Sequence, residues 1–187
     1  MKSTKIRLAD YWYPVTVFGS GKKLGVWMQG CSRKCKGCIS PEYRSYDGGT
    51  SITSEELMQC VAAVRPEGLV ISGGEPFDQP EALWSLVKAF NDTYSDDIIV
   101  YTGYTSAALM KKENSLYKKI ISSIAVLIDG EYIPELNTGE GLAGSSNQNI
   151  HIYRHHDRYR RANSWERQVM CVLKKDGTLW MIGVPPV

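Results

Sequence analysis

Three cysteines within eight residues constrain this chain more than any other feature. Cys31, Cys35 and Cys38 have the spacing C-x3-C-x2-C. Three thiolates on one tight loop can bind three irons of a cubane cluster and leave the fourth iron without a protein ligand. A ferredoxin-type carrier needs a fourth cysteine for each cluster, and only Cys60 and Cys171 remain. The spacing therefore predicts a [4Fe–4S] cluster with one iron open to chemistry.

A structural zinc site is the alternative for the same cysteines. His151, His155 or His156 could then supply a fourth ligand. Zinc sites usually pair two close ligands with two more further along the chain, and no second C-x2-C pair follows here. The clustering favours a metal over disulfides, and Cys60 and Cys171 are predicted to be small core residues outside the site.

The composition fits one globular domain. The chain has 187 residues, of which 43% are hydrophobic and 22% charged, so we expect residues 1–187 to share one core. A net charge of +2 gives no global field for nucleic acid or an anionic membrane. No apolar run follows the first basic residues, and no stretch approaches the roughly 20 apolar residues that cross a bilayer. We expect a cytoplasmic protein.

Short apolar runs alternate with helical patterns along the chain. The predicted strands are 24–29, 69–72, 98–101 and 124–128, and the predicted helices are 53–64, 79–90 and 105–121, the last in two pieces about Asn114. This order is typical of a parallel sheet with helices on its outer face, with functional residues at the carboxyl ends of the strands. Further on, 169–173 and 178–182 flank a turn signal and predict a hairpin.

A second motif follows the second predicted strand. Ser72-Gly73-Gly74-Glu75-Pro76 stands where that strand must end. With the cysteine motif before it, this segment resembles the signature of the radical S-adenosylmethionine (SAM) superfamily. Either motif alone is weak evidence, but the two in this order are specific.

Further segments narrow the resemblance. They are Val26-Trp27-Met28-Gln29-Gly30-Cys31, Cys35-Lys36-Gly37-Cys38, Tyr101-Thr102-Gly103-Tyr104, Asp129-Gly130 and Gly144-Ser145-Ser146-Asn147-Gln148. Together, over roughly residues 12–150, they resemble the activating proteins of anaerobic ribonucleotide reductases, which belong to the glycyl-radical activases. The resemblance implies an α/β fold, namely an incomplete parallel β/α barrel of the radical SAM type. Residues 151–187 would form a C-terminal extension with a basic segment and the hairpin.

The resemblance also implies the chemistry and the partners. A [4Fe–4S] cluster on Cys31, Cys35 and Cys38 would reductively cleave SAM to methionine and a 5′-deoxyadenosyl radical. That radical would remove a hydrogen atom from a glycine of a glycyl-radical enzyme such as the anaerobic ribonucleotide reductase. An electron donor such as flavodoxin or ferredoxin would supply the electron.

The resemblance assigns further residues to the SAM site. Glu75, with backbone carbonyls near Gly73 and Gly74, offers acceptors for the SAM ammonium group. Thr102 and Tyr104 would line the pocket. Asp129 would lie near the methionine carboxylate, where a monovalent cation can bind.

Two assignments stay open within the resemblance. Many superfamily members have an aromatic residue where this chain has Gly37, so the adenine contact is expected from Ile39 or Tyr43. Ser146, Asn147 and Gln148 match a loop near SAM or the partner.

The extension contains a basic segment, 151–161, in which arginines alternate with Tyr153 and Tyr159. Such a run can dock an acidic partner, a reductant or nucleic acid, but it is more often a solvated helix face, and nucleic acid is not expected as a partner. Trp165 and Trp180 are expected in the core or an interface.

Two other functions are compatible with these motifs. The first keeps the radical chemistry but acts on a ribosomal peptide or a small metabolite, with the extension forming part of the pocket. The second is a non-enzymatic zinc-binding docking module.

Overall fold

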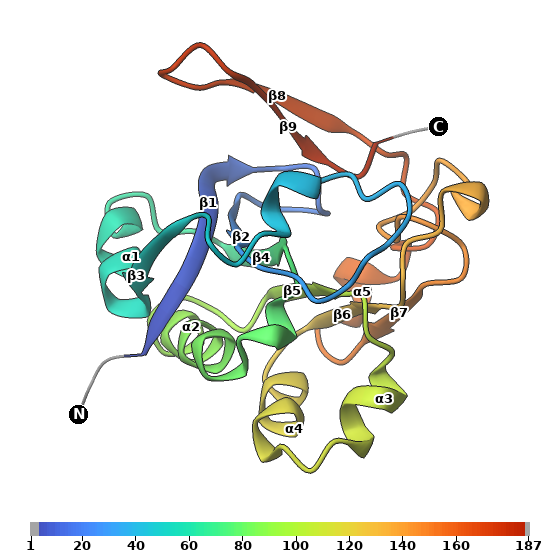
Figure 1. The fold of residues 1–187 in the computed structure, drawn as a ribbon, viewed down its shortest axis with the longest axis horizontal. Helices are drawn as coiled ribbons and strands as arrows, with labels where there is room; N and C mark the ends of the chain where they lie inside the picture. Colours follow the sequence, from blue (N-terminus) through green and yellow to red (C-terminus); the bar gives the residue numbers. More distant parts are fainter. Residues whose placement is uncertain (1–3, 186–187) are drawn as a thin grey trace.

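The computed structural model of the protein describes residues 4–185, and its centre is one seven-stranded sheet (Figure 1). The strand order is β3-β1-β2-β4-β5-β6-β7. The strands are β1 (Lys5–Val15), β2 (Lys23–Met28), β3 (Thr50–Thr53), β4 (Gly68–Gly73), β5 (Ile98–Thr102), β6 (Val126–Asp129) and β7 (Asn149–Ile152).

The middle of the sheet is parallel and its two sides are antiparallel. Strands β2, β4, β5 and β6 pair in parallel, whereas β1, β3 and β7 pair antiparallel with their neighbours. The predicted α/β class and parallel centre are confirmed, and the sheet of the described residues is open, with β3 and β7 at its edges. The three antiparallel strands were not predicted. β3 and β7 are short edge strands, which are defined by their pairing partners more than by local pattern, and β1 has no regular alternation of buried and exposed residues along its length.

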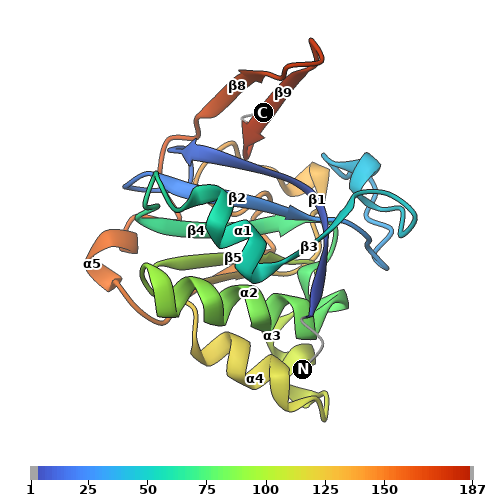
Figure 2. The same cartoon turned by 90° about the vertical axis from the view of Figure 1, so that its left-hand side faces the viewer.

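Helices cover one face of this sheet (Figure 2). They are α1 (Ser54–Val61), α2 (Pro80–Thr93), α3 (Ser106–Lys111) and α4 (Ser115–Ser122). A capping box of Thr53 and Glu56 starts α1, where the predicted helix 53–64 begins. Asn114 caps α4 and separates it from α3, so the predicted division of this region is confirmed.

The central strands are buried on both faces, because successive side chains point to opposite sides. Leu69 and Ile71 of β4 face the helices, whereas Val70 faces the other way. The second face is covered by the C-terminal segment, in which Tyr159 and Val172 are buried. The extension therefore completes the core.

The C-terminal segment contains α5 (His156–Tyr159) and a separate two-stranded sheet of β8 (Val169–Leu173) and β9 (Leu179–Gly183). The predicted hairpin is confirmed, and it projects from the body at the end opposite α4 (Figures 1 and 2). The prediction that Cys60 and Cys171 are core residues is wrong, since both are exposed. Cys60 lies on the exposed side of α1, and Cys171 lies on the side of β8 that faces solvent.

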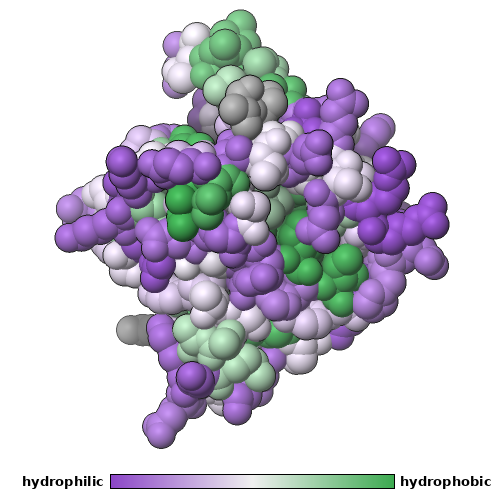
Figure 3. All heavy atoms as spheres, turned by 90° about the vertical axis from the view of Figure 1, so that its right-hand side faces the viewer, coloured by the Kyte–Doolittle hydropathy of each residue, from purple (hydrophilic) through white to green (hydrophobic). Residues whose placement is uncertain are grey.

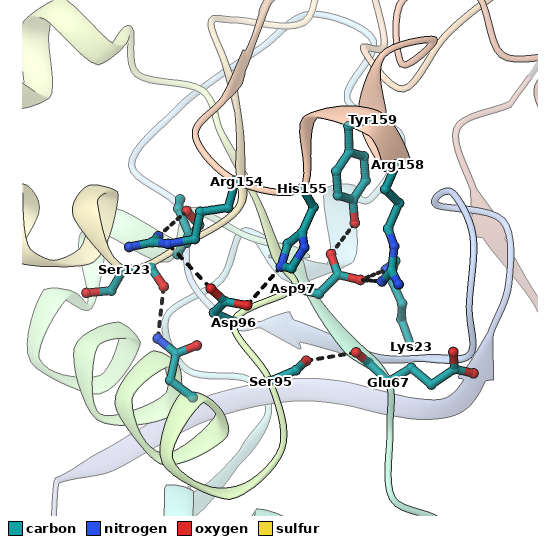
Figure 4. A network of polar contacts seen from close by, with 12 residues as sticks. Lys23, Glu67, Ser95, Asp96, Asp97, Ser123, Arg154, His155, Arg158 and Tyr159 are labelled. Atoms are coloured by element: carbon teal, nitrogen blue, oxygen red, sulfur yellow. Dashed lines mark hydrogen bonds and ion pairs between the residues drawn. The ribbon is translucent and has the colours of Figure 1, made fainter.

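The extension contacts a buried ion pair at the amino ends of the parallel strands (Figure 4). Lys23 Nζ lies 2.5 Å from Asp97 Oδ2, and both side chains are buried. Arg158 and Tyr159 of the α5 region also donate hydrogen bonds to Asp97. The prediction of a solvated helix face is therefore wrong for Tyr159, which is buried, whereas Arg158 is exposed and still pairs with Asp97. Both residues provide donors that a buried carboxylate needs.

No helix between residues 4 and 185 is both long enough and apolar enough to cross a membrane.

Candidate active site

The cysteine loop begins directly after β2, at the carboxyl end of the parallel strands. Backbone hydrogen bonds hold its start: Gly30 N–H donates to the Tyr43 carbonyl at 2.8 Å, and Cys31 N–H donates to the Arg44 carbonyl at 3.0 Å. The Arg44 guanidinium in turn donates to the Cys35 carbonyl. The segment after the third cysteine thus folds back and fixes the loop that carries all three.

The two glycines of the second motif let β4 end against this loop. Gly73 has a φ of +101°, a conformation that residues with a side chain rarely adopt. A Cβ on Gly74 would lie 2.1 Å from the Gly30 carbonyl oxygen. Glu75 N–H donates to that same carbonyl at 2.9 Å. The glycine pair is therefore required for contact between the two motifs, a reason that the sequence alone did not give.

Both motifs border one cavity of about 550 Å³. The predicted site residues in its lining are Cys31, Cys35, Cys38, Gly73, Gly74, Glu75 and Thr102. Ile39, one of the two candidates for the adenine contact, lines the cavity, whereas Tyr43 is buried beneath the loop and is not part of the lining. Asn137, Gly144 and Gln148 also line the cavity. They belong to residues 137–149, here called the polar loop, which includes the segment expected near SAM or the partner.

Among the described residues that line the cavity, Glu75 is the only buried carboxylate, with 1% of its surface exposed. Burial raises its pKa to about 7, although hydrogen bonds that favour the ionised form oppose the effect. These come from Thr102 Oγ1 at 2.8 Å, Gly103 N–H at 2.8 Å and Phe77 N–H at 3.0 Å. The carboxyl group is fixed in place and able to stabilise a cation in the cavity.

Tyr104 and Asp129 lie next to the cavity without being part of its lining. The Tyr104 hydroxyl donates to Asp78 at 2.8 Å. Asp129 is buried, accepts hydrogen bonds from Ser106 N–H and the Asn149 amide, and has His151 Nε2 at 3.1 Å without hydrogen-bond geometry. Gly130, which follows Asp129 in the sequence, does line the cavity.

Asp78 is a functional candidate that sequence reasoning missed. It follows the Gly-Gly-Glu-Pro motif by two residues, and its carboxylate accepts hydrogen bonds from Ser32 N–H at 2.7 Å, Tyr46 at 2.7 Å and Tyr104 at 2.8 Å. These hydrogen bonds lower its pKa even though burial acts in the opposite direction. Its short spacing from Glu75 was the available signal, but its partners are distant in sequence.

The hairpin forms part of the cavity wall, a role predicted for the extension only under the alternative of a peptide or metabolite substrate. The residues it contributes are Val169, Leu179, Trp180, Met181 and Gly183. The ring of Trp180 packs edge-on against Trp27 of β2, with 4.5 Å between centroids. Arg167 attaches the hairpin to the polar loop through the carbonyls of Gly141 and Ala143.

The donor set fits an iron–sulfur cluster. Burial raises the pKa of the Cys31 thiol to about 11, with nearby Glu75 and Asp78 adding to the effect, and burial together with Glu131 raises that of Cys35. Metal binding would have to displace these protons. Within residues 4–185, no three His, Cys, Asp or Glu side chains are gathered closely enough to enclose a metal ion. All three thiols nevertheless line one cavity, and rotation of the side chains about χ1 would leave them there. This shared location is the feature that fits the cluster.

None of the described histidines considered for zinc lines the cavity. His151 lies beside Asp129, whereas His155 Nε2 lies 2.8 Å from Asp96, at the amino ends of the parallel strands (Figure 4).

Comparison with known proteins agrees with this site. Residues 17–151 match the family model described as "4Fe-4S single cluster domain". With the cavity and the two motifs, this match defines an iron–sulfur protein of the radical SAM class.

Curated relatives identify the family. The anaerobic ribonucleoside-triphosphate reductase-activating protein of Vibrio cholerae is 33% identical over 76% of this chain and 96% of its own length, and that of Haemophilus influenzae is 30% identical over 76% and 96%. The pyruvate formate-lyase-activating enzyme of Clostridium pasteurianum is 32% identical over 47% of this chain and 40% of its own length. The chain belongs to the family of anaerobic ribonucleoside-triphosphate reductase-activating proteins.

Proposed function

We propose that this protein activates an anaerobic ribonucleotide reductase by removing a hydrogen atom from a backbone glycine of that enzyme. The observation that carries the proposal is the single cavity bordered by the three cysteines and the Gly73-Gly74-Glu75 segment. When bound, a [4Fe–4S] cluster would supply the electron that cleaves SAM to methionine and a 5′-deoxyadenosyl radical.

The residues of the chain hold and orient these groups. Cys31, Cys35 and Cys38 would bind three irons and leave the fourth for SAM. Glu75, ionised, would accept a charge-assisted hydrogen bond from the SAM ammonium group. Arg33, which lines the cavity and lies 3.2 Å from Glu131, brings a positive charge to the same space.

Further residues around the cavity complete the proposed SAM site. Thr102 would contact SAM directly, whereas Tyr104 would act through Asp78 and Ser32, to which its hydroxyl is hydrogen-bonded. The oxygens of Asp129 already accept protein donors. A monovalent cation there, an electron donor such as flavodoxin or ferredoxin and a cytoplasmic location stay predictions.

An anaerobic assay tests the proposal. The protein is reconstituted with iron and sulfide, reduced with dithionite and given SAM, with and without the purified anaerobic ribonucleotide reductase of the same genome. We expect 5′-deoxyadenosine in both cases and a glycyl radical in the electron paramagnetic resonance spectrum only with the reductase.

Each other outcome points to a different function. Formation of 5′-deoxyadenosine without a glycyl radical on the reductase would contradict the activase role and favour a peptide or metabolite substrate. Zinc binding without cluster assembly would contradict the radical chemistry itself and favour the docking module.

A further inference from the structure

The hairpin of β8 and β9 has two apolar faces. Residues directly opposite in an antiparallel pair share a face. The register pairs Met170 with Ile182 and Val172 with Trp180 on the face that packs against the body. The other face, here called the outer face, consists of Val169, Cys171, Leu173, Leu179 and Met181.

The outer face is exposed. Leu173 is 71% exposed, Leu179 is 64% exposed and Met181 is 62% exposed. Figure 3 shows the corresponding hydrophobic patch at the projecting end of the molecule. A contiguous apolar surface of this kind is typical of an interaction site.

The outer face is continuous with the cavity. Val169, Leu179 and Met181 belong to both. Ile39 of the cysteine loop, 58% exposed, adds a further apolar side chain to the cavity lining. A chain that lies on the outer face therefore contacts side chains that also line the cavity.

The backbone of the hairpin also has unused hydrogen-bonding capacity. Within residues 4–185, β8 and β9 pair only with each other, so their outer edges carry unpaired N–H and C=O groups. Such an edge accepts an extended strand from another chain.

The hairpin lies outside the part of the chain that the family model matches, which ends at residue 151. The relative from Vibrio cholerae is 96% covered by 76% of this chain. About a quarter of the chain therefore lies outside the match with that relative, and the family match assigns the hairpin no role.

We infer that the outer face binds an extended, apolar segment of the glycyl-radical enzyme and guides its glycine into the cavity. This inference rests on the proposed function, because the substrate atom is then a backbone Cα–H that must reach the cavity on a polypeptide. A second copy of this chain is the other possible occupant. Because the outer face shares residues with the cavity, a dimer formed there would cover the entrance and exclude the protein substrate.

The test uses the full chain with Cys171→Thr and Leu173→Thr combined, two outer-face positions that are not part of the cavity lining. Threonine keeps the strand propensity while reducing apolar surface. The matched control combines Val64→Thr and Met110→Thr, which are exposed apolar residues on other parts of the molecule.

With the purified anaerobic ribonucleotide reductase as substrate, we expect the double variant to raise the apparent KM for the reductase about tenfold. The control variant should stay within about twofold of the unaltered protein, and SAM cleavage without the reductase should be unchanged in both. Circular dichroism and the thermal midpoint establish that the hairpin variant is folded. Leu173→Thr alone provides a second, milder variant.

Three outcomes would overturn the inference and are distinguishable. An unchanged KM in the double variant would refute docking on the outer face while leaving the activase role intact. No glycyl radical with the unaltered protein would refute the proposed function and, with it, this inference. A dimer in sedimentation that the double variant converts to a monomer would assign the face to a second copy.

Discussion

The carboxylate of Asp78 accepts a 2.7 Å hydrogen bond from the backbone N–H of Ser32, the residue that follows Cys31. The same carboxylate also accepts from the Ser32 hydroxyl at 3.1 Å. Asp78 belongs to the short 3-10 helix directly after the Gly-Gly-Glu-Pro motif. One side chain thus attaches the cysteine loop to the second motif.

Replacing Asp78 with alanine should loosen the cysteine loop without unfolding the protein. The loop would lose acceptors for Ser32, Tyr46 and Tyr104. We expect lower iron and sulfide content after reconstitution, by about half or more, because hydrogen bonds to a charged group contribute about 1.5–3 kcal/mol each. Asp78→Asn keeps one acceptor oxygen and should recover part of the loss. The exposed Asp92→Ala is the control, and equal cluster content in all three variants would refute the role of Asp78.

Replacement of any one of Cys31, Cys35 and Cys38 with alanine should abolish SAM cleavage, because each loop thiolate is expected to bind one iron. Cys60→Ala and Cys171→Ala should retain it, since both residues are exposed and neither is in the cavity lining. The measurement is 5′-deoxyadenosine formed per cluster under dithionite. If any of the three loop variants still cleaved SAM, the assignment of the cluster to these cysteines would be wrong.

Glu75→Gln should weaken SAM binding by about tenfold or more, because a neutral amide loses a charge-assisted hydrogen bond of roughly 2 kcal/mol. The pKa of Glu75 is raised to about 7 by burial, so the carboxyl group is ionised above that pH and protonated below it. A cationic ligand favours the ionised form, and the affinity of the unaltered protein for SAM should therefore fall as the pH drops through about 7. The variant should lack this dependence. Equilibrium dialysis of labelled SAM measures the affinity and its pH dependence. If the variant and the unaltered protein gave the same pH profile, a group other than Glu75 would be responsible for it.

Asp97→Asn should lower the free energy of unfolding by about 3 kcal/mol at neutral pH, since it leaves Lys23 buried without an anionic partner. Burial alone would raise the pKa of Asp97, but the charge of Lys23 and the hydrogen bonds from Lys23, Tyr159 and Arg158 outweigh it and lower the pKa. A lowered carboxyl pKa stabilises the fold above the unfolded value of about 4, and this stabilisation is lost as the pH falls through the folded value.

The difference in the free energy of unfolding between the variant and the unaltered protein should therefore be largest near pH 7 and become smaller below about pH 4. Urea unfolding at several pH values measures it. Asp96→Asn is the matched control, because Asp96 is a half-exposed neighbour that pairs with Arg154 and His155. It should change stability by about 1 kcal/mol or less. A difference that stays constant with pH would show that the carboxyl charge of Asp97 is not responsible.

The sequence by itself determined the local features of this protein. The cysteine spacing and the Gly-Gly-Glu-Pro segment were sufficient to predict the radical SAM class of protein. The capping residues Thr53 and Asn114 determine where two helices start. The parallel centre followed from the alternation of apolar runs with helical patterns. These signals act over a few residues, so they can be read along the chain.

Only the tertiary structure decided the features that depend on distant partners. They are the edge strands, Asp78 at the cysteine loop, Arg158 on Asp97 and the hairpin in the cavity wall. Each joins residues about twenty or more positions apart in sequence. Cys60 and Cys171 show the same limit, since cysteine's general tendency to be buried says nothing about which face of a helix or hairpin is covered. The physical reason is that burial and pairing are set by which surfaces meet, and that is a property of the folded chain.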